Sequence, residues 1–222
     1  MSSASTRVGR FRRKPTIAAA GVLLVAATLV ACGSNDAPDP EVTAFRNSAG
    51  VSAATAWAAQ YRLDTTGQKT AATVDVARVP DQLRLDITTG SGVATNISGA
   101  KGAISCQTSP DKTAICVQAA VPGQTPPAAL DPALRAVLAI TLPAIAAGRA
   151  DVEYLGPSVD AKFPDATCAR VSGEGVAQGV YCLFPDGVPA SANFPSGSIV
   201  FVKRLPAPES TAFNPPASPR PR

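Results

Sequence analysis

Four cysteines in the middle and C-terminal parts of this 222-residue sequence restrict its fold most strongly. In "AISCQTSPDKTAICVQ" two strand-like runs flank the turn-forming SPDK, and folding the chain there places Cys106 opposite Cys116. In "TCARVSGEGVAQGVYCLF" a turn near GEG brings Cys168 opposite Cys182. Directly opposed strand residues lie close to disulfide range. Of the three connectivities that four cysteines allow, we therefore predict two hairpins, each closed by its own disulfide.

A zinc site is the alternative use of these cysteines. Their spacings are C-x9-C and C-x13-C, whereas zinc sites favour C-x2-C, and the sequence contains no histidine. We predict neither a metal site nor a cofactor.

Alternating apolar residues predict more strands before and after the hairpins. Period-two alternation aligns Trp57 with Tyr61 and Leu63, Val74 with Val76, Leu83 with Leu85 and Ile87, and Val93 with Ile97. Proline- and glycine-containing turns at 80–81, 90–92 and 99–102 separate these runs. Strands resume in "DVEYLG", "VPASANF" and "SIVFVKRL", so most of the domain is expected to be one antiparallel sheet.

One helical segment interrupts the strands, in "LDPALRAVLAITLPAIAAG". Asp131 is the expected N-cap, Pro132 the first helical residue and Gly148 the stop, and Pro143 is expected to kink or split the helix. Its apolar residues point to almost every side: Leu134, Val137, Leu138, Ile140, Leu142 and Ile145. A helix of this kind is buried. The predicted fold class is α+β, with a curved antiparallel sheet, a half-barrel, wrapped around a central apolar helical segment.

The meander "AWAAQYRLDTT…TVDVARVPDQLRLDITT…ISGAKGAISC" resembles the LolA/LppX-type fold of cell-envelope lipoprotein carriers over about residues 45–205. Proteins of that type curl an antiparallel sheet over helices and hold acyl chains between the two layers. The second half, "TCARVSGEGVAQGVYCLFPDGVPASANFPSGSIVFVKRL", resembles the ending of many actinobacterial lipoproteins. The resemblance implies an apolar ligand between sheet and helix.

The N-terminus has the layout of a secretory signal. Residues 7–14 hold five cations and no acid, and residues 15–31 are uncharged. The run ends in Leu-Val-Ala-Cys at residues 29–32, which resembles the lipobox of bacterial lipoproteins and implies that Cys32 receives a diacylglyceryl group and becomes the new N-terminus. An uncleaved signal anchor is the alternative. The expected location is the outer face of the cytoplasmic membrane, with the lipid on Cys32 as the membrane contact.

These features predict four segments and a charge balance for the mature chain. The segments are a signal peptide at 1–31, a flexible tether at 32–42, a single domain at 43–206 and a disordered Pro-rich tail at 207–222. Removing the five signal cations from the total of 20 leaves 15 basic against 16 acidic residues. The basic balance therefore belongs to the signal, and we predict no nucleic-acid partner.

No catalytic arrangement is recognisable. The absence of histidine excludes a Ser-His-Asp triad and a Cys-His pair. Ser98 and Lys101 match the S-x-x-K pattern of penicillin-recognising enzymes, but they fall in a glycine-flanked turn rather than on a helix, so we interpret the match as chance. Asp75, Asp86 and Asp151 are scattered along predicted strands and are interpreted as solvated. We predict that the protein is not an enzyme.

Two functions remain from this sequence. The first is a carrier that binds a lipid or another hydrophobic ligand between the helix and the strand face opposite it. Its predicted ligand-lining residues are Trp57, Tyr61, Leu83, Leu85, Leu134 and Leu138. The second is a scaffold, interaction or sensor lipoprotein with a solid core.

Overall fold

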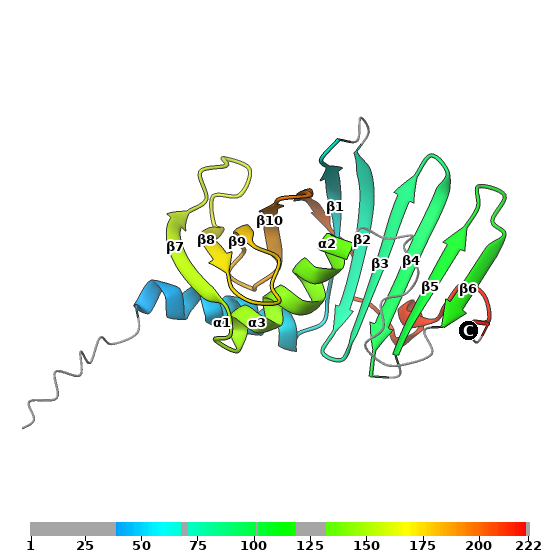
Figure 1. Cartoon of the computed structure of the whole chain (residues 1–222), viewed down its shortest axis with the longest axis horizontal. Helices are drawn as coiled ribbons and strands as arrows, with labels where there is room; N and C mark the ends of the chain where they lie inside the picture. Colours follow the sequence, from blue (N-terminus) through cyan, green and yellow to red (C-terminus); the bar gives the residue numbers. More distant parts are fainter. Residues whose placement is uncertain (1–38, 68–70, 101, 119–131, 221–222) are drawn as a thin grey trace, which may run out of the picture. The chain divides into compact units, whose positions relative to one another are not determined.

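The computed structural model describes residues 39–67, 71–100, 102–118 and 132–220, in which eleven strands form one open antiparallel sheet (Figure 1). The strand order is β6-β5-β4-β3-β2-β1-β11-β10-β9-β8-β7. The strands are β1 (Trp57–Thr65), β2 (Ala72–Val79), β3 (Gln82–Thr89), β4 (Gly92–Gly99), β5 (Gly102–Thr108), β6 (Ala114–Gln118), β7 (Asp151–Pro157), β8 (Thr167–Ser172), β9 (Gly179–Leu183), β10 (Pro189–Phe194) and β11 (Gly197–Arg204). The predicted antiparallel sheet with two disulfide-closed hairpins is confirmed.

Two meanders meet in the middle of this sheet. Strands β1 to β6 pair in sequence order, and so do β7 to β11, which gives an N-terminal and a C-terminal half. The halves join where β1 pairs with β11, with Leu63 opposite Ile199 and Gln60 opposite Lys203. A β-bulge between Gln60 and Tyr61 shifts the register at this seam. This pairing joins strands that are far apart in the sequence, and no local sequence pattern predicts it.

Alternation along the strands separates two faces of the sheet. In β2 and β3 the buried positions alternate with half-buried ones, as the period-two pattern predicted. The core-facing side carries Tyr61, Val74, Val76, Leu85 and Ile199, all at most 1% exposed, and they belong to one hydrophobic cluster with buried residues of the helices. We call the opposite side of the sheet the outer face.

The first helix, α1 (Pro40–Ala54), begins inside the stretch that the sequence assigned to a flexible tether. Asp39 caps it through backbone N–H groups of Glu41 and Val42, with Pro40 at the first turn. A hydrogen bond with the Glu41 side chain, together with these backbone hydrogen bonds, lowers the pKa of the Asp39 carboxyl. The buried residues are Phe45, Ala49 and Ser52, so apolar periodicity is weak and gave no helical signal. Helix α1 contacts β7, β8 and β9.

The backbone of Gly187 allows α1 to lie close to the sheet. A Cβ atom at this position would collide with the carbonyl oxygen of Ser48, and the φ of Gly187 is +79°, a conformation that other residues rarely adopt. Any side chain here would push α1 away.

The predicted central helix is divided into α2 (Pro132–Arg135), a π-helical turn (Ala136–Thr141) and α3 (Leu142–Ala146). Its stop at Gly148 is confirmed, with φ +69°. The π turn ends at Thr141, two residues before Pro143, which has no N–H. The N–H of Leu142 reaches back five residues to the carbonyl of Val137, and the carbonyl oxygen of Leu138 accepts a hydrogen bond from Arg78 Nη1 at 2.8 Å. The predicted N-cap, Asp131, lies outside the described residues.

Within the described part of the chain, no helix is both long and apolar enough to cross a membrane.

Candidate functional site

A row of polar side chains crosses the outer face of the N-terminal half. Register pairs Gln60 with Asp75, Asp75 with Asp86, Asp86 with Thr95 and Thr95 with Cys106. Residues directly opposed in neighbouring strands point to the same side of the sheet, so these five side chains form one line across β1 to β5. The sheet thus brings together residues that are scattered in the sequence.

Hydrogen bonds fix two carboxylates in this row. Arg84 Nε lies 2.7 Å from Asp86 Oδ2, and the Thr95 hydroxyl donates to Asp86 Oδ1 at 2.5 Å. Gln60 Nε2 donates to Asp75 Oδ1 at 2.9 Å. Like charges directly opposed across strands repel each other, and the Arg84 guanidinium and the Gln60 amide offset that cost. The side chains of Arg84 and Asp86 are only 21% and 23% exposed, so this ion pair is partly desolvated.

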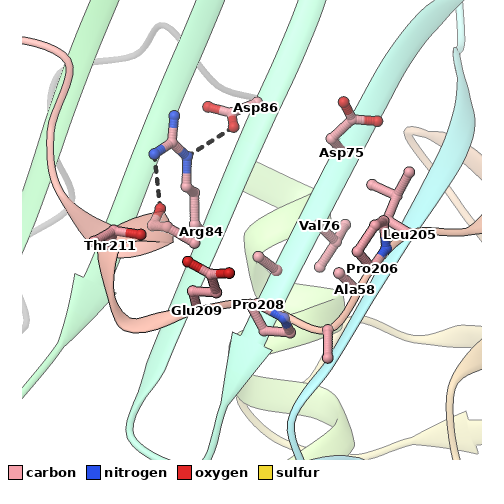
Figure 2. Close-up of a pocket in the computed structure, with 13 residues that line it drawn as sticks. Ala58, Asp75, Val76, Arg84, Asp86, Leu205, Pro206, Pro208, Glu209 and Thr211 are labelled. Atoms are coloured by element: carbon pink, nitrogen blue, oxygen red, sulfur yellow. Dashed lines mark hydrogen bonds and ion pairs between the residues drawn. The ribbon is translucent and has the colours of Figure 1, made fainter.

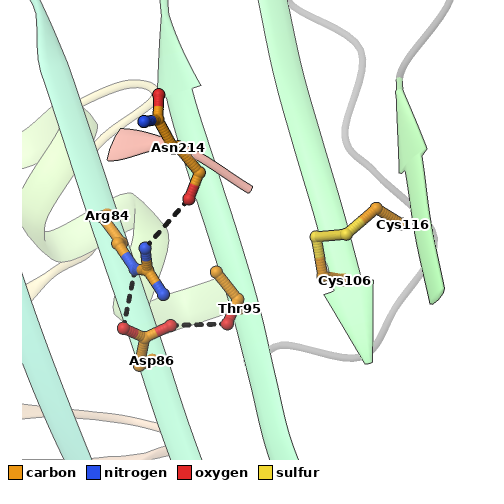
Figure 3. The surroundings of a disulfide bond; sticks show 6 residues. All are labelled: Arg84, Asp86, Thr95, Cys106, Cys116 and Asn214. Atoms are coloured by element: carbon orange, nitrogen blue, oxygen red, sulfur yellow. Dashed lines mark hydrogen bonds and ion pairs between the residues drawn. A yellow bond between two sulfur atoms is a disulfide. The ribbon is translucent and has the colours of Figure 1, made fainter. Parts of the chain in front are cut away.

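The C-terminal segment of the chain lies across this row. We call residues 205–220 the strap. Arg84 Nη1 donates to the carbonyl oxygen of Ala212 at 2.8 Å. It also donates to the carbonyl oxygen of Asn214 at 3.2 Å (Figure 3). Phe213, at the end of a short 3-10 helix (Ser210–Phe213), is 8% exposed. Residues 207–220, which the sequence assigned to a disordered tail, thus contain a short helix and a buried phenylalanine.

The strap ends against the strand of the first disulfide. The backbone N–H of Arg220 donates to the carbonyl of Cys116 at 3.0 Å, and that of Gln118 donates to the carbonyl of Arg220 at 3.2 Å. These bonds occupy part of the outer edge of β6, which is otherwise the end of the sheet. The ordered strap could not be predicted from local composition, because the segment is rich in Pro and Ser and its hydrogen-bond partners lie in the distant strands β3 and β6.

Between the strap and the sheet lies a groove of about 440 Å³ (Figure 2). Its floor is Ala58, Ala77 and the Asp75–Asp86 row, and its wall is the strap residues Leu205 to Ala212. Carboxylates of Asp75, Asp86 and Glu209 and the Arg84 guanidinium line it beside Pro206 and Pro208. The groove combines fixed acceptors with apolar surface, which suits recognition of a hydrogen-bond-donating group on a partner or ligand.

The six predicted ligand-lining residues lie elsewhere. Trp57, Tyr61, Leu83, Leu85, Leu134 and Leu138 are between 0% and 6% exposed and belong to the same hydrophobic cluster. None of them lines the 440 Å³ groove, which is on the outer face. In this structure they pack as core, with helix side chains against sheet side chains.

Two tyrosine hydroxyls in this core are shielded from solvent. Burial raises the pKa of Tyr181 to about 12, and its hydroxyl donates to the carbonyl of Ala177 at 2.6 Å. The N–H of Ala177 in turn donates to the Thr141 hydroxyl at 2.9 Å, which ties the β8–β9 turn to the π turn. Burial also raises the pKa of Tyr61, whose hydroxyl has no hydrogen-bond partner in the described residues.

Both predicted disulfides are present. Cys106 bonds Cys116, and Cys168 bonds Cys182, each between directly paired residues of neighbouring strands. Cys32 lies outside the described residues. Among those that are described, no group of three or more cysteine, aspartate or glutamate side chains is placed to hold a metal ion.

Sequence reasoning missed Arg84, Asp86 and the strap as a unit. Asp86 was interpreted as solvated, yet both of its oxygens are bonded. The spacing Arg84-x-Asp86 in a strand places both side chains on one face, and this was the available signal.

Comparison with protein-family models and with curated proteins finds no match for this chain.

Proposed function

We propose that this chain is a lipid-anchored protein of the bacterial cell envelope that acts by binding a partner, without catalysis. The groove between the strap and the outer face carries the proposal, because it is the place where polar side chains are held ready at a surface while the apolar residues fill the core. The lipobox-like ending at Cys32 supports the anchor, and two disulfides suit an oxidising compartment.

The resemblance to the LolA/LppX type, with a sheet curved around helices, is part of this proposal. One hydrophobic cluster contains residues of α1, the π turn, α3 and both halves of the sheet, which supports such an arrangement. Apart from a small pocket beside Arg78, the space between the layers is occupied by the protein's own side chains, so we place the partner-binding surface on the outer face.

Site-specific photocrosslinking tests the groove as a binding surface. A photoreactive residue at Thr211, which lines the groove, is expected to capture a discrete envelope component, while one at Glu174, an exposed turn residue absent from the groove lining, is not. Equal capture at both positions, or none at Thr211, contradicts the proposal. The same cells test the anchor: Cys32→Ser is expected to release the protein from the membrane fraction and remove acyl mass from its N-terminus.

A carrier of lipids or other hydrophobic ligands is the second candidate. The aliphatic cluster between helices and sheet favours it, because parting the layers would expose an apolar lining. Native mass spectrometry of the full-length protein purified from membranes distinguishes the two. A discrete extra mass, beyond the anchor, that fragments as lipid favours the carrier. The mass of the lipidated chain alone, even after incubation with envelope lipids, favours the groove-binding function.

A further inference from the structure

Arg78 is a buried cation without an ion-pair partner in the described part of the chain. It follows Val74 and Val76 on the core-facing side of β2, and only 6% of it is exposed. Its Nη1 donates to the carbonyl of Leu138 at 2.8 Å, while its Nε has no hydrogen-bond partner. A guanidinium carries five N–H donors, and one carbonyl leaves most of this capacity unused.

This arrangement is costly by itself. Removing a charge from water carries a large desolvation penalty, which a nearby opposite charge normally offsets. Burial lowers the pKa of Arg78 for the same reason. The buried arginine at the end of β2 therefore calls for a counter-charge that the described residues do not supply.

A small cavity lies directly beside this side chain. It measures about 170 Å³ and is bounded by Arg78, by residues 80–82 of the turn, by Leu83, by Ser98 and Gly99 of β4 and by Ala139 of the π turn. Leu83 is the one predicted ligand-lining residue among them. Register places Ser98 on the same side of the sheet as Arg78, through Leu83 between them, and its hydroxyl offers a further donor. The one acid among the lining residues, Asp81, is exposed and makes no ion pair with Arg78. At roughly 30 Å³ per water, this volume holds a small oxyanion with a few waters.

We propose that this cavity is an anion site, in which the Arg78 guanidinium and the Ser98 hydroxyl hold a phosphate or carboxylate group. Arginine suits such groups because its planar fork donates two parallel hydrogen bonds to one oxyanion. The site lies at the junction of sheet and π turn, so an anion there would also strengthen the contact between Arg78 and Leu138. It is independent of the groove on the outer face.

NMR of the full-length protein in an uncharged detergent tests the site directly. The Nε–H resonance of Arg78 is expected to shift saturably on titration with inorganic phosphate, with acetate or with phosphatidylglycerol in mixed micelles. A shift with phosphate or acetate alone assigns a free oxyanion, and a shift with the lipid alone assigns a lipid headgroup. No shift with any of the three overturns the proposal.

Variants separate the site from general salt effects. Phosphate stabilises many proteins by exclusion from their surface, so the control is Arg62→Gln, an exposed arginine of β1. Arg78→Gln is expected to weaken binding of the anion at least about tenfold, since a charge-assisted hydrogen bond is lost. Arg62→Gln is expected to bind as the unmodified protein does. Equal binding by Arg78→Gln contradicts the site, and the wild-type titration remains decisive if that variant does not fold.

Discussion

The outer faces of the two halves of the sheet contain similar structural elements, but the side chains that these elements cover differ in polarity. Each half has a disulfide hairpin, a segment that lies over the outer face and an arginine paired with an aspartate. In the N-terminal half the strap covers a polar row, and Arg84 pairs with Asp86. In the C-terminal half the loop 158–166 places Phe163 against Phe184 and Phe201, and Arg204 pairs with Asp186.

The difference lies in what the covering segment closes. Phe163, Ala166, Cys168, Cys182 and Ala190 form a separate buried cluster on the C-terminal half. Arg204 lies 5.4 Å and 5.6 Å from the ring centroids of Phe184 and Phe201, as a cation above an apolar cluster. The strap, by contrast, leaves a 440 Å³ groove above hydrogen-bonded carboxylates. The C-terminal half is closed where loop 158–166 covers it, and its own pocket of about 410 Å³ lies elsewhere, along β8 to β10. In the N-terminal half the groove lies directly beneath the covering segment.

The largest predicted effect concerns the C-terminal half. Phe163→Ala removes a 6% exposed ring and its edge-on contacts with Phe184 and Phe201. We expect the free energy of unfolding to fall by about 3 kcal/mol, the usual loss for a buried phenylalanine. Equilibrium urea unfolding of the oxidised protein measures it. A loss below about 1 kcal/mol would mean that the packing of loop 158–166 contributes little to the stability of the protein.

Arg84→Ala is expected to have the next largest effect on stability, and it acts on the N-terminal half. It leaves the partly buried Asp86 without its cation and two strap carbonyls without their donor. We expect a loss of about 2 kcal/mol in the same urea experiment. Arg204→Ala is the matched control, because its ion pair is 41% and 55% exposed and such pairs contribute about 1 kcal/mol or less. Similar losses for both variants would remove the distinction between the two halves.

Phe213→Ala is expected to free the strap while leaving the sheet folded. Phe213 is 8% exposed and belongs to a segment held mostly by backbone hydrogen bonds and Arg84. The amide of Arg220, which donates to Cys116, is expected to exchange with solvent about tenfold faster, with core amides such as that of Ile199 unchanged. Hydrogen exchange read by NMR checks this. Equal acceleration at both amides would show that the strap is part of the global folding unit.

Acidification is expected to have the smallest effect, and to act on the C-terminal half first. The pKa of Asp39 is lowered from 3.8 by a hydrogen bond with the Glu41 side chain and by the backbone N–H groups it accepts from, so its stabilisation of α1 is complete above pH 3.8 and is lost as pH falls through the lowered value. Helix α1 contacts β7, β8 and β9. Amides of α1 are expected to exchange faster below pH 3.8, and Asp39→Asn, which keeps a capping oxygen, is expected to lose this pH dependence. An unchanged pH dependence in that variant would assign the effect to another carboxyl.

The elements that the sequence predicted are those whose cause is local. Turn residues between opposed cysteines predicted both hairpins, and the apolar alternation in β1 to β4 predicted which residues lie on the core-facing side of the sheet. Pro143 and Gly148 marked the break and the end of the central helix.

What escaped prediction depends on contacts between distant segments. The strap is held by Arg84 and by the edge of β6, and its own composition resembles a disordered tail. Helix α1 buries few residues, so its signal was the cap at Asp39 rather than a pattern. Asp75, Asp86 and Thr95 are about ten residues apart in the sequence, and only the register of β2, β3 and β4 makes them neighbours.

The seam between β1 and β11 has a consequence for how the chain acquires its structure. Strands β1 to β6 can pair one after another as they emerge, since each needs only the strand before it. Strand β1 then keeps one unpaired edge until β11, the last strand of the chain, becomes available, and pairings of such long sequence separation form slowly. During that interval the open edge is both the template for completing the sheet and its most aggregation-prone surface. We therefore expect the time at which β11 pairs with β1 to influence how much of this protein reaches its native state.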